Sequence, residues 1–355
     1  MHSTLIINFI CKDMKDLSTL QHFVGCDISK DTLDFALYER GKDYRTFEHI
    51  QVPNSPDGFK TMRKWLRTLK VRMKDAVIAM EHTGSYSMAL SEWCFGKGIT
   101  FVMLHPLDVK NYGGTSRNKT DKADSQFIAD YAYTMREKLK PSVPESANIK
   151  QLRQLRNERQ LAVRSRTAYI NLLKSMPDNV DKRRIEKIIK EFEAQIKQIE
   201  SEMNTVISRD KAILANYDLL LSIPGIGLVN AVTTIIATGN FTRFQTARQY
   251  AKFCCVAPLS RQSGTSVAKG DHVSKAGHNE IKSVLTEGAR SAITHDSQIR
   301  AYYERKKSEG KCHGCILNAV KFKLICRMFA VVSRQRPYVD VEAYRSRTVK
   351  SADSA

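Results

Sequence analysis

The sequence predicts an α/β domain over residues 23–140, followed by a mainly helical half. First, three strand-like runs come in close succession and are followed by alternating helical and strand patterns. Second, Pro141 and Pro144 interrupt these patterns and mark a domain boundary. Third, long runs with helical periodicity dominate the chain beyond that boundary. Together these observations indicate an α/β-plus-α organisation.

The elements of the first domain follow from alternation and turn residues. The expected strands are 23–26 with 28–30, 32–38, 44–52, 76–80 and 100–104. The expected helices are about 56–71, 88–95 and 121–135, the first opening with Ser55 and Pro56 because a capping residue followed by proline is typical of a helix start. Three meandering strands followed by alternating helix and strand describe an RNase H-like layout. In that layout acidic residues gather at strand ends near the centre of the sheet.

Four carboxylates stand where these predicted elements end or begin. Asp27 closes the first strand, Glu81 closes the strand 76–80, and Asp121 and Asp124 lie three residues apart at a helix start. Converging carboxylates repel one another unless a divalent cation lies among them, and phosphoryl transfer uses such oxygen ligands to hold Mg²⁺. The alternative is that Asp121 and Asp124 complement the helix dipole behind the capping residue Thr120.

The composition points to a polyanionic partner. The chain has 355 residues, and its 57 Lys and Arg exceed its 37 Asp and Glu to give a formal charge of +20. Such an excess favours nucleic acid first and an anionic membrane surface second. No apolar run approaches the roughly 20 residues that span a bilayer, and residues 1–22 are expected to form a loose extension. The eight scattered cysteines are typical of reduced thiols in a cytoplasm.

Two long helical patterns follow the boundary, over residues 145–215. The first, 149–176, is strongly basic and includes Arg153 and Arg156, which suits a nucleic-acid backbone. The second follows a four-three apolar repeat from Ile185 to Val206, which predicts a coiled-coil seam. An intramolecular helical hairpin and a dimerising arm are equally compatible with this pattern.

The last domain, 216–337, is expected to be mainly helical. Its motif Ile223-Pro-Gly-Ile-Gly227 lies between two helical runs, as in a helix-hairpin-helix, where Gly225 and Gly227 would let the turn approach a phosphate backbone. An ordinary glycine turn between packed helices is the alternative. Further helices are expected at about 279–295 and 313–333, followed by a flexible tail, 338–355.

Several stretches resemble the DEDD-type insertion-sequence transposases, a family that carries a RuvC-like N-terminal domain and includes a pilin-gene invertase. They are 25–30 with 33–37, 81–86, 118–124, 223–227, 262–264 and 273–277. The resemblance implies that Asp27, Glu81, Asp121 and Asp124 are the four family acids, with Mg²⁺ as cofactor. It also implies that Ser263, before Gly264, attacks the DNA phosphate in a composite site between protomers. From the residues alone, Ser260, Ser263 and Ser266 remain alternatives.

These observations predict a DNA transposase or recombinase that acts as a homo-oligomer on the ends of an insertion sequence. The resemblance implies guidance by an RNA transcribed from the element, with contacts from residues such as Lys275. A site-specific invertase is one alternative, and a RuvC-like junction-resolving nuclease without a covalent intermediate is another. A nucleic-acid-binding protein without activity is a third. The expected location is the cytoplasm of a bacterium or archaeon, at the nucleoid, with no membrane partner.

Overall fold

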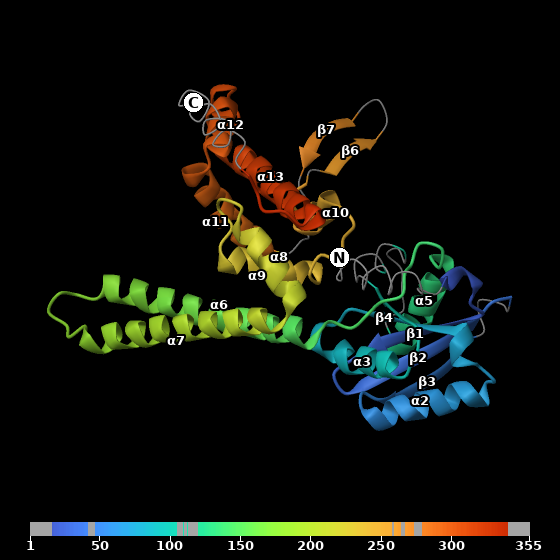
Figure 1. Ribbon diagram of the computed structural model, residues 1–355. Coiled ribbons are helices and arrows are strands. Elements are labelled where there is room, and N and C mark those ends of the chain that lie inside the picture. Colours follow the sequence, from blue (N-terminus) through green and yellow to red (C-terminus); the bar gives the residue numbers. More distant parts are fainter. Residues whose placement is uncertain are drawn as a thin grey trace. The chain divides into compact units, whose positions relative to one another are not determined.

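The computed structural model describes residues 16–41, 47–104, 109, 112, 120–257, 259–263, 267–272 and 279–339 (Figure 1). It divides into two compact units, which meet in the sequence at Pro144 and Glu145. Within the described ranges, no helix combines the length and the apolar character that crossing a membrane requires.

The first unit is built on a five-stranded mixed sheet. Its strands are β1 (His22–Ile28), β2 (Thr32–Glu39), β3 (Glu48–Pro53), β4 (Ala76–Glu81) and β5 (Phe101–Leu104). They lie in the order β3-β2-β1-β4-β5, with β2 antiparallel to both neighbours and β1, β4 and β5 mutually parallel. This α/β arrangement is compatible with the predicted RNase H-like layout.

Helices cover both faces of this sheet. The bounds are α2 (Pro56–Thr68), α3 (Met88–Gly96) and α5 (Asp121–Thr134), with short 3₁₀ turns at Leu17–Thr19, Met73–Asp75 and Gly84–Ser87. Side chains from alternate strand positions such as Phe35 and Ile78 pack with α2 and α3 in one core. Those at the intervening positions, such as Phe23 and Ala79, pack with α5 in the other. The two sides of the sheet are therefore different, and α5 defines one of them (Figure 1).

The residues just before β1 differ from the expected loose extension. Asp16 caps the 3₁₀ turn Leu17–Thr19, and both Leu17 and Leu20 are buried in the core on the α5 side. Their apolar side chains complete that core, so at least residues 16–22 belong to the folded unit.

The second unit is mainly helical. Its helices are α6 (Ala147–Ser175), α7 (Arg183–Arg209), α8 (Lys211–Leu221), α9 (Leu228–Thr238), α10 (Ala247–Phe253), α11 (Asn279–His295), α12 (Ser297–Ser308) and α13 (His313–Arg334). Helices α6 and α7 pack side by side along their length, and the ring of Tyr169 contacts that of Phe192. The base of this pair shares one core with α8–α13, through residues such as Leu152 and Met203.

Three elements of this unit were not predicted from the sequence. A two-stranded antiparallel hairpin, β6 (Leu259–Ser263) and β7 (Val267–His272), occupies a stretch of mostly small and polar residues for which the sequence predicted no strands. Helix α10 opens with a capping box at Thr246, and helix α12 is capped by Asp296. All three elements are short, and their sequences have no strong apolar periodicity.

Candidate active site

A close approach between β1 and α5 determines how the strand that carries Asp27 lies against the helix that carries Asp121 and Asp124. Gly25 lies on the α5 side of β1, and a Cβ atom added there would be 2.1 Å from the carbonyl oxygen of Ser125 and 2.3 Å from the amide nitrogen of Ala129. Only glycine permits this contact, because the atoms it meets belong to the α5 backbone. The sequence places Asp27 two residues further along the same face of β1.

The start of α5 carries two of the four predicted acids. The hydroxyl of Thr120 accepts a hydrogen bond from the amide of Ala123 at 3.2 Å, which confirms the predicted helix cap. Asp121 and Asp124 follow in the first helical turn, where a negative charge also complements the helix dipole. Asp121 is exposed and Asp124 is half-buried. The cap therefore fixes the start of α5 and with it the positions of Asp121 and Asp124 in the first turn.

Asp27 and Glu81 lie at neighbouring strand ends. The last paired residues of the parallel strands β1 and β4 are Cys26 and Met80, and each acid follows directly. Both acids occupy the α5 side by alternation, since Ala79 packs in the core with α5 and Glu81 is two residues later. Carboxyl ends of parallel strands are the usual place for a site in such sheets.

The pKa of Asp27 reflects its burial and the charges of the α5 acids. Burial and then the negative charges of Asp124 and Asp121 raise the pKa of Asp27 from 3.8 to about 6, although the amide of Ile28 donates to its Oδ1 at 3.1 Å. Carboxylates that repel in this way are the ligand type that Mg²⁺ takes. Among the residues that the structure describes, no three His, Cys, Asp or Glu side chains stand close enough to hold a metal ion. The ligand chemistry fits Mg²⁺, but these residues do not form a closed set of ligands.

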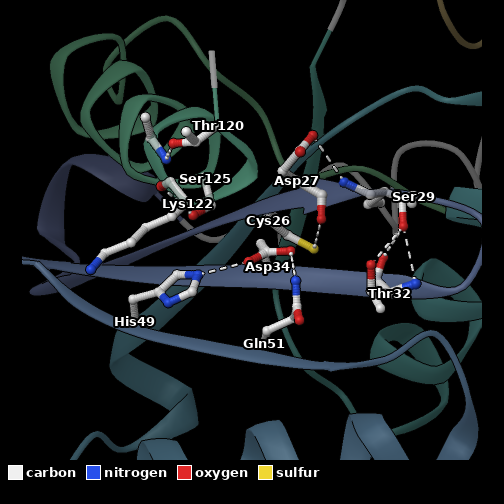
Figure 2. A network of polar contacts seen from close by, with 12 residues as sticks. Cys26, Asp27, Ser29, Thr32, Asp34, His49, Gln51, Thr120, Lys122 and Ser125 are labelled. Carbon is white, nitrogen blue, oxygen red and sulfur yellow. Dashed lines mark hydrogen bonds and ion pairs between the residues drawn. The ribbon is translucent and has the colours of Figure 1, made fainter. Parts of the chain in front are cut away.

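A fifth carboxylate, which the sequence did not single out, lies beside Asp27. Asp34 is the cross-strand partner of Asp27 on β2, and its side chain is nearly fully buried on the same face of the sheet. Its Oδ1 is hydrogen-bonded to Nε2 of His49 at 2.8 Å, and its Oδ2 accepts a hydrogen bond from Nε2 of Gln51 at 3.0 Å (Figure 2). The alternation of Leu33, Phe35 and Leu37 places Asp34 on the opposite face of β2, and its hydrogen-bond partners come from β3.

We expect Asp34→Ala to lower the free energy of unfolding by about 2 kcal/mol, because two partly buried donors lose their shared acceptor. Thermal unfolding of the full chain measures this loss. Asp57→Ala, which removes an exposed partner of Lys60 on α2, is the control and should leave the midpoint unchanged. Equal midpoints for both variants would show that the Asp34 network contributes nothing to stability.

The predicted serine lies at the end of β6. Ser263 is the last residue of that strand and pairs with Val267 of β7, so it lies beside the turn of the hairpin. Gly264, Ser266 and Lys275 lie outside the described residues, whereas Ser260 lies within β6. The backbone therefore places Ser263 at a hairpin tip and Ser260 nearer its base.

The two glycines of the 223–227 turn have different surroundings. Gly225 has φ +90°, and an added Cβ would meet the carbonyl oxygen of Gly288 at 2.5 Å and the Cβ of Ala292 at 2.8 Å. It is therefore required for packing against α11. Gly227 is exposed, precedes the first residue of α9 and has open space around an added Cβ. Of the two, Gly227 has the geometry to approach a ligand.

The arginines predicted to contact nucleic acid are engaged within the unit. Arg153 pairs with Glu145, and Arg156 lies 3.4 Å from Glu280 of α11. Burial lowers the pKa of Arg156, and the negative charge of Glu280 opposes this effect. The first pair is local to the start of α6, the second connects α6 to α11, and both reduce the charge available to a phosphate.

Comparison with known proteins identifies the family. Residues 24–180 match the model of a DEDD transposase family of the IS110 type, described as "Transposase". Residues 217–304 match a second model, "Transposase IS116/IS110/IS902 family". The unmatched stretch between the two ranges is mostly helix α7, and the ranges follow the order expected from the sequence motifs.

Relatives of nearly the same length carry related names. The chain is 25% identical to a pilin gene-inverting protein of Moraxella bovis, over 89% of this chain and 97% of the relative. It is 25% identical to the transposase for insertion sequence element IS1111A of Coxiella burnetii, over 92% and 93% respectively. A protein of insertion element IS110 from Streptomyces coelicolor is 31% identical over 32% of this chain and 28% of the relative. The chain belongs to the IS110-type DEDD transposase family and is a DNA transposase or recombinase.

Proposed function

We propose that this protein excises and inserts an insertion sequence, using Mg²⁺ held by Asp27, Glu81, Asp121 and Asp124 and a nucleophile at Ser263. The observation that carries the proposal is that the charges of Asp124 and Asp121 act on Asp27, whose pKa is raised to about 6 by burial first and by these two carboxylates next. Acids that serve only to cap a helix have no reason to converge on a partly buried strand residue.

Bound Mg²⁺ would polarise the scissile phosphodiester and neutralise charge that develops on it. The chain's own residues supply the position: Gly25 allows α5 to approach β1, and Thr120 fixes the first turn of α5. Glu81 completes the set from the adjacent strand end. Since no three of these side chains already gather at metal-binding distance, binding has to draw them together.

Ser263 is the proposed nucleophile. Its hydroxyl oxygen forms a bond to phosphorus, its proton is lost to a base, and the P–O bond to the leaving strand breaks with a proton taken up by the leaving hydroxyl. The product is a phosphoserine link to DNA. Because one phosphoester bond replaces another, a DNA hydroxyl can later displace the serine and rejoin a strand without an external energy source. Its place beside a hairpin turn suits this role, because a tip residue can reach a strand that the packed helices cannot.

Further parts of the chain are assigned to nucleic-acid binding and assembly. We assign α8, the 223–227 turn and α9 to a helix-hairpin-helix in which Gly227 approaches a phosphate. We assign the α6–α7 pair, residues 145–215, to a coiled-coil spacer between the catalytic domain 23–140 and the domain 216–337. A guide RNA is the proposed partner of the remaining basic surface, and the working form is a homo-oligomer.

A second candidate function is site-specific DNA inversion. It is favoured by the similarity to the Moraxella bovis pilin gene-inverting protein, which extends over 97% of that relative. Both functions use the same chemistry and differ in the DNA that is recombined. Sequencing the DNA on either side of the gene distinguishes them, because element ends support transposition and an invertible segment supports inversion.

The serine proposal predicts a covalent protein–DNA species. The full chain, incubated with Mg²⁺, the element RNA and end-labelled element DNA, should yield a labelled adduct that survives denaturation. Ser263→Ala should abolish this adduct, whereas Ser260→Ala and Ser266→Ala should retain it. Denaturing gel electrophoresis measures the labelled fraction.

An adduct that persists in Ser263→Ala would show that another residue is the nucleophile. Strand cleavage by the wild-type protein without any adduct would instead support direct hydrolysis by water. Binding of the same DNA by Ser263→Ala should equal that of the wild-type protein, which excludes misfolding as the cause of a lost adduct.

A further inference from the structure

A lysine that has no anionic partner among the described residues is buried between two helices of the second unit. Lys321 lies on α13, only 5% of its surface is exposed, and its Nζ donates to the hydroxyl of Thr286 on α11 at 3.2 Å. That hydroxyl in turn donates to the carbonyl oxygen of Lys282 at 2.7 Å. Burying an ammonium group is costly unless a negative charge compensates it.

The charged groups around Lys321 increase this cost. Burial lowers the pKa of Lys321, and the positive charges of Lys282 and Arg290 lower it further. Within the described part of the chain no carboxylate opposes this effect. The acid next along α11, Glu287, instead lies 2.8 Å from Arg290. The arrangement therefore lacks an anion.

The cationic groups form one row that opens to solvent. Lys282, Thr286 and Arg290 are spaced four residues apart, so they share one face of α11, and Lys321 meets that face at its middle. Lys282 is half-buried and Arg290 is exposed. The two ends of the row are therefore more accessible to solvent than Lys321 at its middle.

This row lies at the base of the hairpin that carries Ser263. Asn318, one turn before Lys321 on α13, donates to the carbonyl oxygen of Val256 at 2.7 Å, just before β6 begins. Lys282 lies in the first turn of α11, the next helix after β7. The residues just before β6 therefore contact α13, and in the sequence the segment after β7 leads to α11.

We propose that Lys321, Lys282 and Arg290 form a binding site for a backbone phosphate of the nucleic acid on which the Ser263 hairpin acts. The inference rests on the proposed function and names a substrate contact for it. A phosphodiester supplies the missing negative charge and accepts charge-assisted hydrogen bonds from an ammonium that the protein already holds in place. The site reads no base, so it positions the strand without selecting its sequence.

The test removes the buried ammonium group of Lys321 and retains an apolar side chain in its place. Lys321→Met retains an unbranched apolar side chain of similar length, so the free protein should unfold at a higher temperature than the wild type. Its affinity for element DNA should fall about tenfold at 150 mM salt, and the slope of log K against log salt should decrease by about 1. Fluorescence anisotropy of labelled DNA with the full chain, between 50 and 300 mM salt, measures both quantities.

Two further variants keep the experiment decisive. Lys323→Met on the same helix removes an exposed ammonium that lies over the ring of Tyr302, and it should leave the DNA affinity within twofold. Lys282→Met removes a charge from the α11 row and should reproduce the affinity loss if Lys321→Met does not fold. The same titrations with the structured element RNA show which phosphate backbone occupies the site, since a loss with either nucleic acid supports it.

Unchanged affinity and salt slope for both Lys321→Met and Lys282→Met, with DNA and with RNA, would overturn the inference. If those variants bind normally while the wild type still forms the Ser263 adduct, the phosphate site alone is wrong. If the wild type forms no adduct although Lys321→Met weakens binding as expected, the serine chemistry fails and the phosphate site stands.

Discussion

Asp27→Asn is expected to lower DNA strand cleavage at least about a hundredfold while making the metal-free protein more stable. The loss of activity follows because even residues that only support metal ligands cost 10–100-fold when they are changed, and Asp27 is a proposed ligand. The gain in stability follows because the substitution removes a carboxylate whose charge is disfavoured by burial and then by the charges of Asp124 and Asp121. A residue that served the fold alone would not change these two properties in opposite directions.

The pH dependence of this gain has a definite sign. In the folded protein the pKa of Asp27 is about 6, above its ordinary value of 3.8, so the folded state binds this proton more tightly than the unfolded state. The resulting stabilisation is full below about pH 3.8 and is lost as the pH rises through about 6. At pH 8 the ionised group therefore disfavours folding, by about 1–2 kcal/mol after allowance for its partial exposure.

Thermal unfolding in EDTA measures this effect. Asp27→Asn should unfold at a higher temperature than the wild type at pH 8, and the difference should shrink towards pH 4. Added Mg²⁺ should raise the wild-type midpoint at pH 8 and leave that of Asp27→Asn unchanged. Asp31→Asn, in the exposed turn after β1, is the matched control and should change neither stability nor cleavage. A variant that is less stable than the wild type at pH 8 would contradict the proposed repulsion.

Gly25→Ala is expected to lower the free energy of unfolding by about 3 kcal/mol and to abolish cleavage. The new Cβ would lie 2.1 Å from the carbonyl oxygen of Ser125, so α5 has to move away from β1. That movement carries Asp121 and Asp124 away from Asp27. The small substitution therefore acts on the site through the position of a helix.

Chemical denaturation and a cleavage assay of the same preparation measure the two consequences. Gly96→Ala is the matched control, because an alanine Cβ at the end of α3 meets no atom within 4 Å. Its stability should equal or slightly exceed that of the wild type. Normal cleavage by Gly25→Ala would show that contact between β1 and α5 does not position the acids.

Local patterns were sufficient for most of the first unit. The alternation in β2, the Ser55 cap before Pro56 and the Thr120 cap before α5 are each visible within a few residues of sequence, and the structure confirms them. The charge effect of Asp124 and Asp121 on Asp27 is compatible with the predicted convergence of these acids, but among the described residues no three possible ligands lie at metal-binding distance.

The remaining features depend on partners that are distant in the sequence. Arg156 looked available to nucleic acid because its partner Glu280 lies 124 residues away. Gly225 was assigned to a phosphate contact, but its conformation serves packing against Gly288 and Ala292. In the sequence Lys321 is one of several basic residues of a helix, and only the folded chain places it beside Lys282 and Arg290 of α11. Tertiary contacts of this kind have no periodicity that a sequence pattern could show.

The measurement that tests the central claim most directly is anomalous diffraction from crystals of the full chain soaked in Mn²⁺, which replaces Mg²⁺ at oxygen ligands. We predict an anomalous peak bounded by carboxylate oxygens of Asp27, Glu81 and Asp124, and its loss in Asp27→Asn crystals. A Mn²⁺ ion bound elsewhere, with these carboxylates left apart in the wild-type protein, would contradict the claim that they form the metal centre.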